Sequence, residues 1–98
     1  VEIGTPIEFR LSQNYPNPFN PSTKIDYDIP FDSKVTLKIY NMLGREVAAP
    51  VRDNLQKAGF YSVDFNGANM TSGTYFYKIA AQSNENDFTM TKKMILMK

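Results

Sequence analysis

The stretch Asn14-Tyr15-Pro16-Asn17-Pro18-Phe19-Asn20-Pro21-Ser22-Thr23 decides how the rest of this chain can fold. It holds three of the six prolines, and proline fixes φ, removes a backbone donor and pushes the preceding residue into extended geometry. Asparagine can bond its own backbone and begin a turn, whereas a flexible linker would be rich in Gly and Ser. We therefore predict a stiff corner leading into a β-domain, with Tyr15 and Phe19 packed onto that domain.

The composition limits the class of protein. The chain has 98 residues, of which 42% are hydrophobic and 13% aromatic, and this predicts one globular domain. The formal net charge is +1, so neither nucleic acid nor an anionic membrane is an expected partner. Cys and His are absent, which excludes most nucleophilic triads and transition-metal sites, and we expect no cofactor. No apolar run approaches the roughly 20 residues that span a bilayer.

Alternation of apolar and polar residues predicts strands over most of the chain. The clearest are residues 23–29 and 34–40, with two sets of inward side chains: Ile25, Tyr27 and Ile29, then Val35, Leu37 and Ile39. Further strands are expected at residues 7–11, 45–51, 59–65, 73–81 and 88–98, and residues 52–57 could form at most one helical turn. Gly44 is expected at the left-handed position of a hairpin turn, and Pro50 indicates an edge strand. Seven short strands predict an all-β fold, an antiparallel immunoglobulin-like β-sandwich.

Three groups of side chains could carry chemistry, and each has a simpler structural explanation. Asp26 and Asp28, with Asp32 nearby, could bind a hard cation or act as an acid–base pair, but exposed acids on a strand are far commoner. Five aromatic residues could form a stacking platform for sugars, although aromatics in strands are usually core; they are Phe60, Tyr61, Tyr75, Phe76 and Tyr77. Lys92, Lys93 and Lys98 form a small basic group that could simply protect a strand edge.

Four motifs resemble the type A C-terminal sorting domain of the type IX (Por) secretion system. Residues 11–23 resemble its opening signature, and residues 35–47 resemble its middle strand-turn-strand. Residues 72–79 and 92–98 resemble its closing strands, in the right order. The structural motif that labels the family comprises Asn14, Tyr15, Pro16, Asn17, Pro18, Phe19, Asn20 and Pro21.

The resemblance implies a signal for export rather than an enzyme. Such domains end secreted proteins of Bacteroidetes, whose cargo enters the periplasm through an upstream N-terminal signal and is then recognised by an outer-membrane translocon. A C-terminal signal peptidase can remove the domain, here near residues 1–6, leaving the cargo secreted or on the cell surface. We expect residues 1–8 to be a linker from the cargo and residues 9–98 to be the sorting domain.

Recognition by the translocon is expected at the closing strands. A rigid sandwich can present its last strand as an edge, where backbone pairing gives affinity and alternate side chains give selectivity. We expect the lysines to supply charge, and Met94 and Leu96 to anchor the strand to the core. The residues assigned to recognition are Gly73, Tyr75, Lys92, Lys93, Met94, Leu96 and Lys98. Two alternatives remain, an accessory carbohydrate-binding module of a glycosidase and a passive spacer domain.

Overall fold

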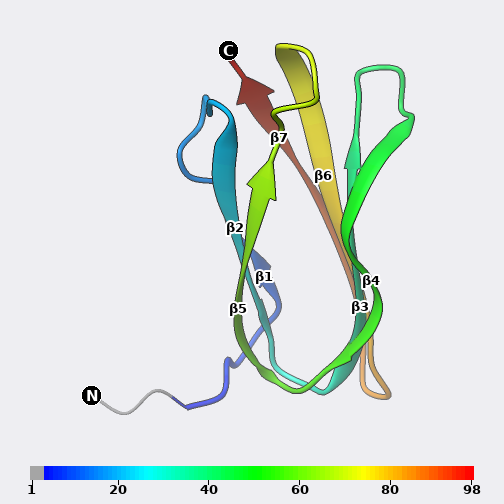
Figure 1. The fold of residues 1–98 in the computed structure, drawn as a ribbon. Coiled ribbons are helices and arrows are strands. Elements are labelled where there is room, and N and C mark those ends of the chain that lie inside the picture. The colour runs from blue at the N-terminus through cyan, green and yellow to red at the C-terminus, as the bar shows by residue number, and fades with distance from the viewer. Residues whose placement is uncertain (1–3) are drawn as a thin grey trace.

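The computed structural model describes residues 4–98, which form two antiparallel sheets packed face to face (Figure 1). One sheet has the order β1-β2-β5 and contains β1 (Arg10–Leu11), β2 (Ser22–Ile29) and β5 (Gly59–Asn66). The other has the order β4-β3-β6-β7 and contains β3 (Ser33–Tyr40), β4 (Glu46–Gln56), β6 (Gly73–Gln82) and β7 (Asp87–Leu96). This confirms the predicted all-β sandwich of seven strands. Within residues 4–98 no helix is long and apolar enough to cross a membrane.

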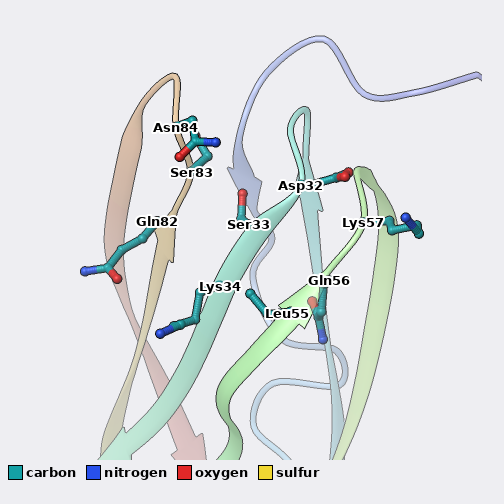
Figure 2. A pocket seen from close by; sticks show the side chains of 9 residues that line it. All are labelled: Asp32, Ser33, Lys34, Leu55, Gln56, Lys57, Gln82, Ser83 and Asn84. Atoms are coloured by element: carbon teal, nitrogen blue, oxygen red, sulfur yellow. The ribbon is translucent and has the colours of Figure 1, made fainter.

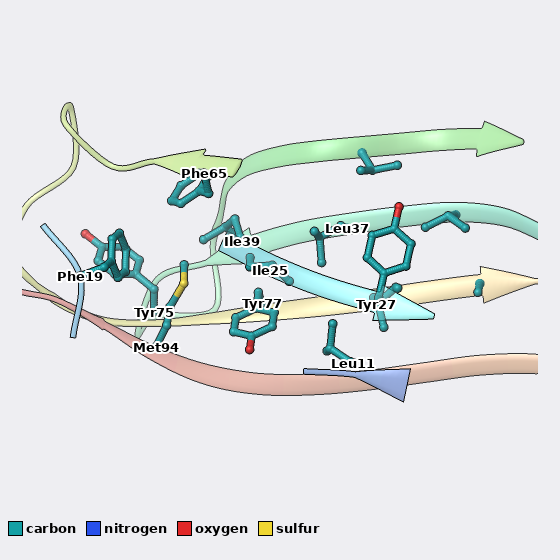
Figure 3. Close-up of a cluster of buried hydrophobic side chains, with 14 of the residues drawn as sticks. Leu11, Phe19, Ile25, Tyr27, Leu37, Ile39, Phe65, Tyr75, Tyr77 and Met94 are labelled. Atoms are coloured by element: carbon teal, nitrogen blue, oxygen red, sulfur yellow. The ribbon is translucent and has the colours of Figure 1, made fainter. Parts of the chain in front are cut away.

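Alternating side chains from both sheets meet in one core (Figure 3). In β2 and β3 the predicted inward residues are at most 1% exposed, because the period-2 pattern leaves each strand one apolar face to bury. Strand β6 is central in its sheet, since it lies between β3 and β7. The core consists of Leu11, Phe19, Ile25, Tyr27, Ile29, Val35, Leu37, Ile39, Val51, Phe65, Tyr75, Tyr77, Ile79, Ala81, Met94 and Leu96.

Strand β4 differs most from the sequence-based expectation. It continues to Gln56, so the strand predicted at 45–51 was too short. Residues 52–57, for which the sequence allowed at most one helical turn, contain no helix. Residues 52–56 lack an alternating apolar pattern, but their backbone pairs with β3, for example Leu55 with Lys34. The strand is irregular, because its register with β3 shifts three times and Asp53 has a φ of 46°. Its place at the edge of the sheet agrees with the prediction from Pro50.

The beginning of the described chain is less regular than expected. The strand predicted at 7–11 is only two residues long, and Ile7 is 95% exposed. Pro6 is nevertheless buried, and the ring of Phe9 stacks on that of Phe88 with 4.9 Å between centroids. Residues 4–9 are therefore held by the stacking of Phe9 and the burial of Pro6, and β-ladder pairing begins only at Arg10. The part of the expected linker and cleavage region at residues 1–3 lies outside the described residues.

The described chain enters the sandwich at one end and finishes at the other, and the β3–β4 turn shows how one of these ends is shaped. Gly44 has a φ of 81° in the β3–β4 turn, which confirms its predicted left-handed position. The side chain of Asn41 accepts hydrogen bonds from the backbone N–H of Leu43 and of Arg45 and shapes this turn. The β3–β4 turn and the C-terminus lie at one end of the molecule, and the chain enters at the other end (Figure 1).

Candidate functional site: the terminal strand and its proline clasp

The proline-rich segment lies along the outer edge of β7 and connects the two sheets. The backbone N–H of Phe19 donates to the carbonyl of Ile95, and the N–H of Met97 donates to the carbonyl of Phe19, both at 2.9 Å. On the other side, Tyr15 and Lys24 of β2 exchange two backbone hydrogen bonds of 2.9 Å. We call residues 13–19 the proline clasp, because they are bonded to β2 in one sheet and to β7 in the other. The prediction of a shaped corner is confirmed.

Two side chains extend the clasp along β7. The Nε2 of Gln13 donates to the carbonyl of Lys93 at 2.7 Å, and the Oδ1 of Asn17 accepts the N–H of Ile95 at 2.9 Å. In an antiparallel strand, every second residue directs its backbone groups away from the neighbouring strand. Both outward groups of Ile95 and the N–H of Met97, the residue just after β7, are therefore already bonded. This part of the edge cannot accept a further strand while the clasp is in place.

A buried polar network fixes the start of the clasp. Asn14 is 2% exposed, and its Nδ2 donates to the Oγ1 of Thr23 at 3.0 Å and to the carbonyl of Pro16 at 3.1 Å. Its backbone N–H donates to the phenol oxygen of Tyr77 at 2.8 Å, and this hydroxyl donates to the carbonyl of Ser12 at 2.6 Å. Burial raises the pKa of Tyr77 to about 12, although the hydrogen bond from Asn14 opposes that rise. Each buried polar atom thus has a partner, as a stable core requires.

The two aromatic residues of the clasp behave differently. Phe19 is 1% exposed and meets Phe65 edge-on, with ring centroids 6.4 Å apart, which agrees with its predicted packing. Tyr15 is 80% exposed, so the prediction that it packs onto the sandwich was wrong. The backbone of Tyr15 pairs with that of Lys24, whose side chain is on the solvent face of β2. Directly opposed residues of an antiparallel pair share a face, and this directs Tyr15 into water.

The residues assigned to recognition occupy three kinds of position. Met94 and Leu96 are fully buried and Tyr75 is 7% exposed, so none of these side chains presents its surface to a partner. Gly73 is exposed and has a φ of 154°, a conformation that favours glycine at the start of β6. Gly73 therefore contributes a backbone conformation and not a side-chain contact.

The three lysines do not form one patch. Lys92 and Lys93 are neighbours in β7, so their side chains point to opposite faces, and Lys93 is the more exposed. The Nζ of Lys98 donates to the carbonyl of Ala68, and its backbone N–H donates to the Oγ of Ser72. The C-terminal lysine is thus held by the β5–β6 loop, whereas Lys93 projects freely beside the clasp.

The clasp contacts of Gln13 and Asn17 were missed by sequence reasoning. Asn17 was recognised only as a turn residue, and Gln13 only as part of a motif. Their partners lie 78 and 80 residues away in sequence, so no local pattern could reveal the contacts. Both side chains form hydrogen bonds with backbone groups of the terminal strand.

The other candidate chemistry is dispersed. Asp26 and Asp28 lie on the solvent side of β2, and partial burial raises the pKa of Asp28 despite nearby Arg10. Among residues 4–98, no group of three His, Cys, Asp or Glu side chains could hold a metal ion. The five aromatic side chains form no stacking platform, because Tyr75 and Tyr77 are buried in the core, the commoner arrangement for aromatics in strands, while Phe60 belongs to the other sheet.

A hollow of about 560 Å³ lies at the end of the sandwich where the chain enters (Figure 2). Two of its polar groups are already used, since Asp32 accepts the N–H of Ala58 and Gln56 accepts the hydroxyl of Tyr27. Figure 2 shows the amino groups of Lys34 and Lys57 pointing in opposite directions. The lining therefore offers no convergent set of polar groups that would orient a ligand.

A family model described as the secretion system C-terminal sorting domain matches residues 13–97. The chain belongs to this family. The match begins at Gln13, the first residue of the clasp, and includes the whole of β7, so it covers both halves of the contact described above. A search of curated proteins and a search of solved structures each gave no match.

Membership of this family gives the chain its function: it is a C-terminal sorting signal for type IX secretion. The family is defined by sorting and not by catalysis, and the carbohydrate-binding alternative receives no support. The clasp and β7 are then the parts of the signal whose geometry calls for an explanation.

Proposed function

We propose that the outer-membrane translocon recognises the sorting domain at the exposed part of β7, beside the proline clasp. The observation that supports this is the point along β7 at which the clasp ends and the outward backbone groups become unpaired. Both outward backbone groups of Ile95 and the N–H of Met97 are bonded, whereas the outward groups of Thr89 and Thr91 have no partner among the described residues. A partner strand could pair there without any change in the domain, and the exposed ammonium of Lys93 lies at the boundary.

The clasp explains how one translocon can accept unrelated cargo. Backbone pairing requires only that the edge has a fixed position, and the clasp fixes β7 against β2 through hydrogen bonds that do not involve the cargo. We propose residues 1–8 as the linker from the cargo, the site of removal by a C-terminal signal peptidase, and residues 9–98 as the sorting domain. The cargo is delivered to the medium or the cell surface, and no catalytic step is assigned to this domain.

Lys93→Ala is expected to lower export about fivefold, because an exposed charged contact contributes on the order of 1 kcal/mol to affinity. The measurement is the amount of a fluorescent cargo, carrying a signal peptide and residues 1–98, that reaches the medium of a type IX-competent host. Lys34→Ala, an exposed lysine of β3 at the other end, is the matched control. Equal export of both variants, or a loss that follows the melting temperature, contradicts the assignment of Lys93.

Thr91→Pro tests the backbone edge itself. The N–H of Thr91 points outward and is not used in the β6–β7 ladder, so proline is tolerated there while a partner strand is excluded. We expect export to fall at least as far as in Lys93→Ala, with circular dichroism unchanged. Deletion of residues 94–98 would be less informative, because it also removes the buried side chains of Met94 and Leu96. Normal export of a folded Thr91→Pro variant would exclude pairing at this edge.

A further inference from the structure

Strand β5 has a long backbone edge without a partner. The N–H of Gly67 donates to the carbonyl of Pro21 at 2.8 Å, which fixes the odd-numbered residues of β5 as those facing β2. The even-numbered residues therefore direct their N–H and C=O groups away from the sheet; they are Phe60, Ser62, Asp64 and Asn66. None of these eight backbone groups forms a hydrogen bond with another residue that the structure describes.

This edge is open because of where β4 lies. In the immunoglobulin constant arrangement the fourth strand pairs with the fifth. Here β4 pairs with β3 in the opposite sheet, so β5 has only β2 beside it. The chain thus leaves uncovered the strand edge that the constant arrangement covers.

The other long edges are irregular or partly covered, and β5 is neither. Edge strands are normally protected by bulges, prolines, lysines or a covering segment. β4 has three register shifts and Pro50, and β7 has two lysines and the proline clasp. β5 runs for eight residues in unbroken register with β2, and its one charged side chain is Asp64. The edge is therefore regular and long enough to pair with another strand.

We propose that two copies of this chain associate through β5, antiparallel and edge to edge, with the two-fold axis at Val63. The two three-stranded sheets then become one continuous sheet of six strands. In this register the outward backbone groups of Ser62 meet those of the partner's Asp64, so the acids do not oppose each other. A two-fold axis at Asp64 would place the two carboxylates directly opposite, which is unfavourable.

The inner face supports the same register. Val63 meets the partner's Val63, and Tyr61 meets the partner's Phe65, as non-hydrogen-bonded pairs in which side chains approach most closely. Val63 and Tyr61 are half-buried in the single chain, so pairing would cover apolar surface that is now exposed to solvent. The edge is thus complementary to itself in hydrogen bonding and apolar contact, with no two carboxylates directly opposed, and this favours a second copy as the occupant.

The association is tested by sedimentation equilibrium of the 98-residue chain at concentrations up to about 1 mM, since one edge-to-edge contact is small and a dissociation constant on the order of 100 µM is expected. Ser62→Pro removes an outward N–H that β2 does not use, and it should raise that constant at least tenfold without unfolding the domain. Thr91→Pro, the same change on the β7 edge, is the matched control and should dimerise normally. A monomer at every concentration, or a dimer that survives Ser62→Pro, overturns the proposal.

A cysteine cross-link tests the register. The chain has no Cys, and directly opposed residues of a non-hydrogen-bonded pair have Cα atoms about 4.5 Å apart, within the range that a disulfide spans. Val63→Cys should form a covalent dimer on mild oxidation, whereas Ser62→Cys, opposite the partner's Asp64, should form far less. Equal cross-linking of both variants, or preferential cross-linking of Ser62→Cys, would reject this register. Because Ser62→Pro should leave export unchanged and Thr91→Pro should lower it, failure of this proposal is distinguishable from failure of the recognition proposal.

Discussion

Phe19→Ala is expected to lower the free energy of unfolding by about 3–5 kcal/mol, the cost of removing a fully buried aromatic side chain from a core. Phe19 is 1% exposed and lies between the two sheets, where it meets Phe65 and lies close to Leu96. A domain of this size has only about 5–15 kcal/mol of stability, so the variant would be marginally folded. Urea denaturation of the 98-residue chain, followed by circular dichroism, measures the loss.

Tyr15→Ala is the matched control from the same motif. Tyr15 is 80% exposed, and substitution of an exposed side chain usually changes stability by less than about 0.5 kcal/mol. The backbone bonds of Tyr15 to Lys24 are available to alanine as well. A loss from Tyr15→Ala equal to that from Phe19→Ala would show that the ring of Tyr15 holds the clasp to the sandwich as strongly as that of Phe19.

The sequence predicted those strands whose side chains divide cleanly between core and water. In β2 and β3 a shift of one residue would expose the whole apolar set, so the alternation determined which side chains are buried. Residues 52–56 gave no such signal, because β4 is irregular there and is held by its backbone pairing with β3 and by hydrogen bonds such as that of Asp53 with Thr36. The predicted strand therefore ended at residue 51, and its continuation to Gln56 was missed.

The clasp shows what a local pattern cannot determine. Three prolines predicted a shaped corner, and the structure has one. The partners of that corner were not predictable, because Gln13 and Asn17 reach backbone atoms of β7 about eighty residues later. The exposure of Tyr15 follows from its pairing with Lys24, which is also a tertiary fact. The motif that labels the family therefore acts on the terminal strand, the region where recognition is proposed.

Tyr77→Phe is expected to lower the free energy of unfolding by about 1–3 kcal/mol at neutral pH. The substitution keeps the ring but leaves the N–H of Asn14 and the carbonyl of Ser12 buried without their partner, which is costlier than losing an exposed hydrogen bond. Tyr40→Phe in β3 is the matched control, since the Tyr40 hydroxyl has no hydrogen-bond partner among the described residues. Denaturant unfolding of the two variants and the unchanged chain gives the comparison.

The stability of the unchanged chain and that of Tyr77→Phe should also respond differently to alkaline pH. Because burial raises the pKa of Tyr77 from 10.0 to about 12, the folded state keeps the phenol protonated where the unfolded state ionises it. The stability linked to Tyr77 is therefore complete below pH 10 and is lost as the pH rises from 10 to about 12. Tyr77→Phe has no such group, so its stability deficit relative to the unchanged chain should shrink over that range. A deficit that stays constant from pH 8 to 11.5 would show that the Tyr77 hydroxyl titrates alike in the folded and unfolded chain, and that the network joining the clasp to β6 does not hold its proton.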